Sequence, residues 1–210
     1  GTMSIAHRLS ELGIEVVGLP KTIDNDLVGT DRTFGFDTAV HIASAAIDRI
    51  HTTAQSHHRV MIVETMGCHA GWIALHAGLA SGADVILLPE LDYTVEEVAR
   101  VCRERERVGQ RFTIVAVAEG AKQKDGEHVV QERDDRRTDS LRLGGIGNVL
   151  ADELREFVDS SVRTTVLGHM QRGGTPTAYD RNLATAFGTR AAALAATFGL
   201  ADIFSMQFGN

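Results

Sequence analysis

The chain has 210 residues, 43% hydrophobic and 23% charged, which is typical of a globular protein with one large domain or two small ones. Its formal net charge of −7 argues against a nucleic-acid surface, which needs a concentrated basic patch, but allows a small phosphorylated ligand. Two cysteines make no disulfide framework or zinc site, and no apolar run reaches the ~20 residues that span a bilayer. We therefore expect a cytoplasmic protein with no nucleic-acid or membrane partner.

Short apolar segments alternate with helical patterns along the chain. Strands are predicted over residues 15–19, 60–64, 84–88, 112–118 and 164–167. These segments are nearly continuously apolar, as expected of strands covered on both faces. Helices are predicted over residues 3–12, 36–55, 70–80, 94–108, 147–158 and 181–198. The alternation indicates an α/β fold with a mostly parallel sheet, and the charged segment 122–142 is predicted to be an exposed loop or hairpin.

The two ends of the chain suggest a piece of a longer protein. Gly1 and Thr2 stand directly before a helical pattern, as the last residues of a phosphate-binding strand–loop–helix would. A further strand-like stretch begins at residues 203–208, just before the last residue.

The segment Pro-Lys-Thr-Ile-Asp-Asn-Asp, residues 20–26, follows the first predicted strand. Pro20 fixes its own φ, which should end the strand and stiffen the loop. In open α/β sheets ligands bind where strands end. Crowding of Asp24 and Asp26 would suit a general base or a bound metal ion, and the alternative is an Asx-rich surface turn.

Two further strand ends carry candidate binding groups. Residues 64–72 form a strand–turn–helix junction whose glycines let a ligand approach the backbone, although helix packing alone would also explain them. Cys68, near the helix start, is a minor candidate for a low-pKa thiol. Glu119 ends an apolar strand, where it would accept substrate hydroxyls or form a structural salt bridge, two equally supported interpretations.

Cations gather around two other strands. Arg59 precedes one strand, while Arg163 precedes and His169 and Arg172 follow another. Two arginines and a histidine around the second strand are costly to bury unless anions pair with them, and guanidinium groups match phosphate oxygens, so they predict a phosphate ligand. Arg59 would either suit a phosphate dianion or simply be solvated.

Taken together, these motifs resemble the phosphofructokinase family, in the bacterial ATP-dependent type with PKTIDND. They are PKTIDND, the Met-Gly turn at 66–67, the strand-ending Ala-Glu-Gly at 118–120, and LGHMQRGGTPTAYDR at 167–181. The resemblance covers essentially the whole chain, in the family's order. It begins inside the family's GGDG[ST] donor-phosphate loop, so we expect an internal or C-terminal fragment.

The resemblance implies a phosphofructokinase-like fold of two Rossmann-like three-layer domains with mostly parallel sheets, the first of them incomplete. Residues 36–172 would form the fructose 6-phosphate-binding domain. Residues 1–35 and 173–210 would be parts of the nucleotide (phosphoryl-donor) domain.

The resemblance also assigns roles by position. Asp24 would be the general base that accepts the proton of the sugar 1-hydroxyl, with Thr22 and Asp26 as the other catalytic residues. The implied substrate-binding residues are Thr22, Ile23, Asp24, Arg59, Met66, Gly67, Cys68, Glu119, Arg163, His169, Met170, Gln171 and Arg172. Arg59 and Arg163 would come from a neighbouring subunit, which implies a homodimer or homotetramer.

The donor side is implied to comprise Gly1, Thr2 and Lys21, with the Mg²⁺ ligand upstream of Gly1 and no metal ligand within the chain. In pyrophosphate-dependent members an aspartate stands at the position of Gly1 and a lysine at that of Lys21, so the two positions give opposite indications. The expected reaction is transfer from ATP to fructose 6-phosphate, giving fructose 1,6-bisphosphate in glycolysis.

One position departs from the family pattern, because Cys68 stands where an arginine usually follows the Met-Gly pair. Loss of that cation would weaken stabilisation of the transferring phosphoryl group, unless His69 or Lys21 replaces it. Two alternatives therefore remain beside the ATP-dependent enzyme. One is a pyrophosphate-dependent phosphofructokinase, and the other is a non-catalytic sugar-phosphate-binding fragment or paralogue.

Overall fold

The computed structural model describes residues 2–14, 16–133 and 141–197. Its centre is a four-stranded parallel sheet whose strands lie in the order β4 (Val85–Leu87), β5 (Thr113–Ala118), β3 (Val60–Thr65) and β8 (Val162–Val166). Every residue of β3 and β5 is buried. The prediction of strands covered on both faces is thus confirmed for these two central strands.

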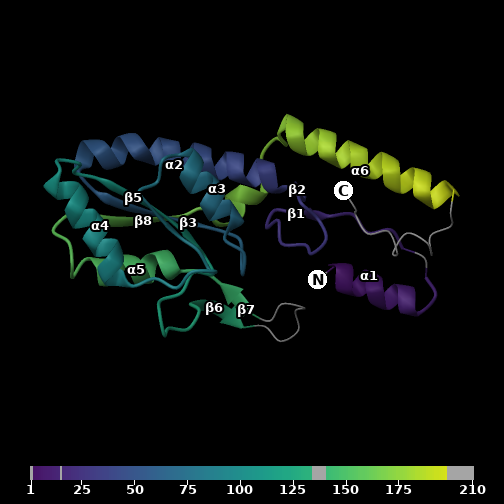
Figure 1. Cartoon of the computed structure of the whole chain (residues 1–210), viewed down its shortest axis with the longest axis horizontal. Helices are drawn as coiled ribbons and strands as arrows, with labels where there is room; N and C mark the ends of the chain where they lie inside the picture. Colours follow the sequence, from purple (N-terminus) through teal and green to yellow (C-terminus); the bar gives the residue numbers. More distant parts are fainter. Residues whose placement is uncertain (1, 15, 134–140, 198–210) are drawn as a thin grey trace.

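Helices cover both faces of the sheet, which gives the three-layer arrangement seen in Figure 1. On one face lie α2 (Phe36–His57) and α3 (Trp72–Ala80), packed over a core that includes Ile47, Val63 and Ile114. On the other face lie α4 (Val95–Arg107) and α5 (Ile146–Leu154).

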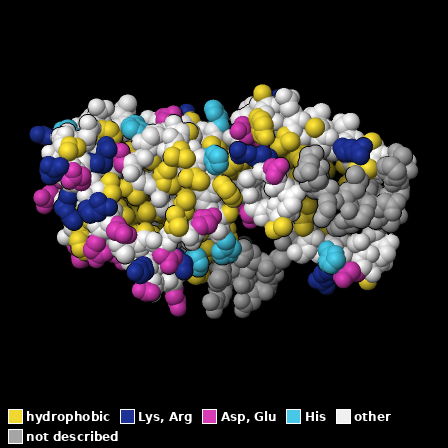
Figure 2. All heavy atoms as spheres, in the orientation of Figure 1, with side chains coloured by type: hydrophobic (Ala, Val, Ile, Leu, Met, Phe, Trp, Pro, Cys, Tyr) yellow, Lys and Arg dark blue, Asp and Glu magenta, His cyan; other side chains and the backbone are white. Residues whose placement is uncertain are grey.

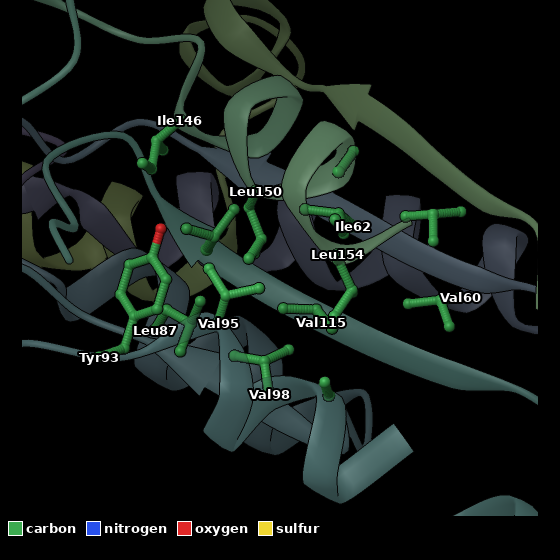
Figure 3. Packing of buried hydrophobic residues seen from close by; sticks show 14 of the residues in the cluster. Val60, Ile62, Leu87, Tyr93, Val95, Val98, Val115, Ile146, Leu150 and Leu154 are labelled. Atoms are coloured by element: carbon green, nitrogen blue, oxygen red, sulfur yellow. The ribbon is translucent and has the colours of Figure 1, made fainter. Parts of the chain in front are cut away.

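The core beneath α4 and α5 is built mostly from aliphatic side chains, with Tyr93 among them, as Figure 3 shows. Ile62 and Val115 reach it from the sheet, and Leu150 and Leu154 reach it from α5. Thr94 begins α4 with a capping box in which its hydroxyl oxygen accepts from the amide of Glu97. These features confirm the predicted α/β fold with a parallel sheet.

The remaining elements lie at the carboxyl ends of the strands or beyond them (Figure 1). They are α1 (Thr2–Glu11), β1 (Lys21–Thr22), β2 (Phe34–Gly35), β6 (Val130–Arg133), β7 (Leu141–Leu143), the 3₁₀ helix η1 (Gly168–Arg172) and α6 (Ala178–Thr197). β6 and β7 pair antiparallel, so the predicted loop or hairpin at 122–142 contains a hairpin. In the described part of the chain, no helix combines the length and apolar character needed to cross a membrane.

The first predicted strand, residues 15–19, is wrong. Residues 16–19 form no strand, and the short strand β1 begins only at Lys21, after Pro20. A strand needs a partner strand to satisfy its backbone groups. Among the described strands, β2 pairs with Lys21 and Thr22, and no described strand pairs with residues 16–19. The strand-like stretch at 203–208 lies outside the described residues.

Acidic and basic side chains are interspersed over the end of the molecule that carries α4, on the face shown in Figure 2. The sequence of α4 accounts for this, because Glu96, Glu97 and Glu104 alternate along it with Arg100 and Arg107. Arg107 donates to Glu104 at 2.7 Å, one turn earlier on the helix. Mixed signs of this kind are typical of a solvated helix face.

Candidate active site

The loop that carries Asp24 is tied to the residues just before α2. Thr33 is 1% exposed, and its hydroxyl donates to the carbonyl oxygen of Thr22 at 2.9 Å. The Thr33 amide donates to the side-chain oxygen of Asn25 at 2.9 Å. Asn25 has a φ of +54°, a conformation that asparagine tolerates better than most residues. The loop is therefore held in one conformation by its own residues and by Thr33.

Asp24 lies directly beside Thr22 in this loop. The Asp24 amide donates to the Thr22 hydroxyl oxygen at 3.2 Å, and that hydroxyl faces the Asp24 carboxylate at 3.4 Å. Ile23, between them, is buried in the core under α2 and α3. Because the buried side chain of Ile23 holds the loop against the core, Asp24 is half-buried, whereas Asp26 is exposed.

Burial raises the pKa of Asp24, and the nearby negative charge of Asp26 raises it further. Arg172 opposes this shift, followed by the Thr22 hydroxyl and Lys21. Two cations therefore act on Asp24, Lys21 from its own loop and Arg172 from η1. A carboxylate whose pKa is shifted toward neutrality is suited to accept a proton.

Glu119 organises the turn between β3 and α3. Its Oε1 accepts from the amides of Gly67 at 3.2 Å and Cys68 at 3.0 Å. Burial raises the pKa of Glu119, the two amide hydrogen bonds lower it, and the charges of Glu64 and Asp24 raise it. Glu119 and Asp24 therefore lie within electrostatic reach of each other, at the carboxyl end of the sheet.

The turn itself has an unusual backbone. Cys68 has a φ of +50° and Gly67 a φ of +146°, and Gly67 has no room for a side chain because a Cβ would overlap the carbonyl oxygen of Ala70. Met66 packs against the core under α2 and α3. His69 is exposed and its ring lies 5.9 Å from that of His128. The cations acting on Asp24 are Arg172 and Lys21, so of the two substitutes considered for the missing arginine, Lys21 lies near the carboxylate.

Two carboxylates that satisfy helix N-termini were missed by sequence reasoning. Glu64, 2% exposed, accepts from the amides of Gly145 at 2.9 Å and Gly147 at 2.8 Å at the start of α5. Glu90 accepts from the amide of Gly71 at 2.9 Å, directly before α3. The start of α3 is therefore already partly satisfied by the protein's own Glu90.

η1 presents its side chains in different directions. His169, Met170 and Arg172 are exposed, whereas Gln171 is 1% exposed and donates to the carbonyl oxygen of Gly168 at 3.3 Å. Of the substrate-binding residues expected here, Gln171 alone has a buried side chain.

Arg59 and Arg163 lie at the other end of the sheet from Asp24. Arg59 immediately precedes β3, and Arg163 pairs with Met61 near the start of β3. Glu119 follows β5, and its amide donates to the carbonyl oxygen of Thr65, the last residue of β3. A strand of this length spans about 17 Å, so these arginines and Glu119 belong to opposite ends of one subunit's sheet.

On the donor side, Gly1 lies outside the described residues. Thr2 is the first residue of α1, and Lys21 is exposed in β1. Among the residues that the structure describes, no three His, Cys, Asp or Glu side chains are grouped so that they could hold a metal ion. Mg²⁺ in phosphoryl-transfer sites is commonly held by one or two carboxylates together with substrate phosphates, and we assign no metal ligand to this chain.

Comparison with known proteins gives a consistent family. The phosphofructokinase family model matches residues 1–195. The ATP-dependent 6-phosphofructokinase 2 of Clostridium perfringens is 54% identical over 211 aligned positions, which cover 100% of this chain and 56% of that protein. The pyrophosphate–fructose 6-phosphate 1-phosphotransferase of Amycolatopsis methanolica is 56% identical over 195 positions, covering 90% of this chain and 55% of that protein.

Solved structures agree with this result. The phosphofructokinase of Saccharomyces cerevisiae has a TM-score of 0.73 at 38% identity, covering 87% of this chain and 23% of that chain. The pyrophosphate-dependent phosphofructokinase of Nitrosospira multiformis has a TM-score of 0.74 at 26% identity, covering 92% of this chain and 48% of that chain. The chain spans about half the length of the curated relatives it matches. From its sequence, its fold and the grouping of its motifs at one end of the sheet, the chain belongs to the phosphofructokinase family.

Proposed function

We propose that the site transfers a phosphoryl group to the 1-hydroxyl of fructose 6-phosphate, with Asp24 as the general base. The observation that carries the proposal is the half-buried Asp24, held by Thr22 in its loop and within electrostatic reach of Arg172, which comes from a segment far away in the sequence. A base and an arginine in one site suit phosphoryl transfer to a sugar phosphate, since the base accepts a proton from the reacting hydroxyl and the arginine pairs with the phosphate at the other end of the sugar.

The surrounding residues supply the other contacts in this proposal. Arg172, with His169 beside it on η1, would bind the 6-phosphate. Because Oε1 of Glu119 receives the amides of Gly67 and Cys68, a sugar hydroxyl would be received by Oε2. The Thr22 hydroxyl accepts from the amide of Asp24, and in this proposal Thr22 would lie near the transferred phosphoryl group. When bound with the donor phosphates, Mg²⁺ supplies neutralisation of their charge.

We propose ATP as the donor, following the glycine at position 1, which leaves room for the nucleotide's α-phosphate. Pyrophosphate is the second candidate, and Lys21 favours it because its charge lies beside the site. Similarity does not separate the two, because relatives named for either donor match at 54% and 56% identity.

The test is formation of fructose 1,6-bisphosphate from fructose 6-phosphate and Mg²⁺, with ATP and pyrophosphate assayed in parallel. Product with ATP alone supports the proposal, and product with pyrophosphate alone identifies the second candidate. No product with either donor, together with intact binding of fructose 6-phosphate, would mark this chain as a sugar-phosphate-binding fragment without a working donor site. The absence of an arginine at Cys68 is the observation that favours this non-catalytic alternative.

We further propose that the working enzyme is a homo-oligomer found in the cytoplasm. In this arrangement Arg59 and Arg163 would complete the site of a neighbouring subunit. Their place at the opposite end of the sheet from Glu119 supports this, because within one chain they lie about a strand's length away. We likewise propose residues 36–172 as the sugar-phosphate domain, and 1–35 with 173–210 as parts of the donor domain.

A further inference from the structure

The first turns of α2 and α6 are joined by four side chains, which we call the α2–α6 clamp: Asp37, Thr38, Thr177 and Asp180. The Asp180 Oδ2 accepts from both the amide, at 2.8 Å, and the hydroxyl of Thr38. The Thr38 hydroxyl oxygen in turn accepts from the amide of Thr177 at 3.1 Å. The Thr177 hydroxyl donates to the Asp37 carboxylate at 2.7 Å.

The clamp replaces a local helix cap. The residue before α2 is Gly35, which has no side chain with which to cap the helix. The cap comes instead from Asp180, 142 residues later in the sequence than Thr38. Asp180 is 4% exposed, and its Oδ1 has no hydrogen-bond partner among the described residues. Gly35 has a φ of +103°, which a serine or aspartate would adopt only with strain, so a local side-chain cap is not favourable at this position. Asp180 therefore supplies the cap from outside α2 and, in doing so, joins α2 to α6 although burying a carboxylate is costly.

The structural effect of the clamp follows from the two segments that it joins. Thr38 follows β2, which pairs with β1 at the start of the Asp24 loop. Asp180 follows η1, whose last residue is Arg172, and η1 packs against α2. The clamp thus fastens the segment that carries Asp24 to the segment that carries Arg172.

We propose that Asp180, acting through Thr38, is a positioning residue that holds η1, and with it Arg172, in place relative to the loop that carries Asp24. The proposal rests on the proposed function in one respect only, the role of Asp24 as the general base. The contact between the two segments is a property of the fold and needs no substrate.

The other groups around Asp24 are not under the control of the clamp. Asp26, Lys21 and Thr22 belong to the same loop as Asp24, so they move with it. Glu119 faces Asp24 from the end of β5, in the central sheet. Of the charged groups that act on Asp24, only Arg172 is carried by the segment that Asp180 fastens.

The test is a titration of the Asp24 carboxyl carbon by NMR in this chain, without substrate or donor. Thr38→Val removes the hydroxyl that bridges Asp180 and Thr177, while Thr38→Ser retains it. Arg172→Met serves as the reference for complete loss of the arginine. We expect Thr38→Val to raise the pKa of Asp24, in the same direction as Arg172→Met, and Thr38→Ser to leave it unchanged.

A matched control separates positioning from general destabilisation. Thr94→Val breaks the capping box of α4, on the far side of the sheet from α2, and should leave the pKa of Asp24 unchanged. If Thr38→Val unfolds the protein, Thr177→Val with Thr177→Ser tests the same clamp from the α6 side. The proposal would be overturned if Arg172→Met raised the pKa of Asp24 but Thr38→Val, or Thr177→Val in its place, did not. It would also be overturned if Thr94→Val raised that pKa by the same amount.

Because the titration needs no turnover, its result is independent of the proposed function. A shifted pKa together with no product from either donor would support the clamp and count against turnover by this chain. Product formation with an unresponsive pKa would support the kinase and contradict the clamp. In an active protein, Thr38→Val should also raise KM for fructose 6-phosphate and move the acid limb of kcat/KM upward, whereas Thr38→Ser should do neither.

Discussion

Gly120 lies directly against the carbonyl oxygen of Cys68, so that a Cβ at position 120 would overlap that oxygen. The oxygen belongs to the backbone of the turn that Glu119 holds through the amides of Gly67 and Cys68. A methyl group here must displace the turn, and with it the surface on which the sugar would lie.

Gly120→Ala is therefore expected to lower the free energy of unfolding by about 1–3 kcal/mol, because the clash is with backbone. Gly188→Ala is the matched control: it lies in α6 with nothing within 4 Å of its Cβ. That change should raise stability by about 0.5–1 kcal/mol through helix propensity. Urea unfolding of the parent and the two variants measures both changes in the free energy of unfolding. Equal stability of the two variants would contradict the close approach of Gly120 to the carbonyl oxygen of Cys68.

Glu64→Gln is expected to lower the free energy of unfolding by about 1–3 kcal/mol, because the buried carboxylate accepts from two amides and an NH₂ group cannot. The exposed Glu156→Gln should change it by less than about 0.5 kcal/mol. Thermal unfolding of both variants checks the prediction, which fails if the two changes have the same effect.

Asp24→Asn is expected to make the protein more stable at neutral pH. Burial and Asp26 raise the pKa of Asp24 in the folded state, so its contribution to stability is present at low pH and lost as pH rises through the folded pKa. An uncharged asparagine avoids that loss. The gain should disappear below the ordinary aspartate pKa, where both states are protonated.

The measurement is the midpoint of thermal unfolding across this pH range, with the exposed Asp48→Asn as the control. Stabilisation by Asp24→Asn that persists at acid pH would show that the carboxylate's ionisation is not its cause.

Cys68→Arg is expected to raise kcat by up to about 10²-fold, by returning a cation to the position after the Met-Gly pair. Cys68→Ser keeps the backbone at a φ of +50° without adding charge and should leave kcat unchanged. If the arginine and serine variants turn over equally, Lys21 and Arg172 already provide the charge that the transferring group needs.

Much of the fold could be predicted from the sequence, because the central strands are continuously apolar and fully buried. The strand predicted at 15–19 failed since its apolar character says nothing about whether a partner lies beside it. The place of Arg59 was also foreseeable in principle: a residue before a parallel strand and a residue after one, such as Glu119, belong to opposite ends of the sheet.

The site was only partly predictable. Asp24, Glu119 and Arg172 stand in short motifs, which local spacing reveals. Asp180 and Glu64 serve helix starts 142 and 83 residues away, and no local pattern encodes such pairings. Thr33 was missed for the same reason, because its hydrogen bonds to Thr22 and Asn25 depend on how the loop folds back.

The most direct test of the central claim is to compare turnover and fructose 6-phosphate binding in the parent chain and in Asp24→Ser. Turnover is measured as fructose 1,6-bisphosphate formed, and binding by calorimetry without donor. If Asp24 is the base, kcat falls at least about 10²-fold while the Kd for fructose 6-phosphate stays nearly unchanged. A Kd that worsens as steeply as kcat falls, or a kcat that survives the substitution, would contradict the assignment.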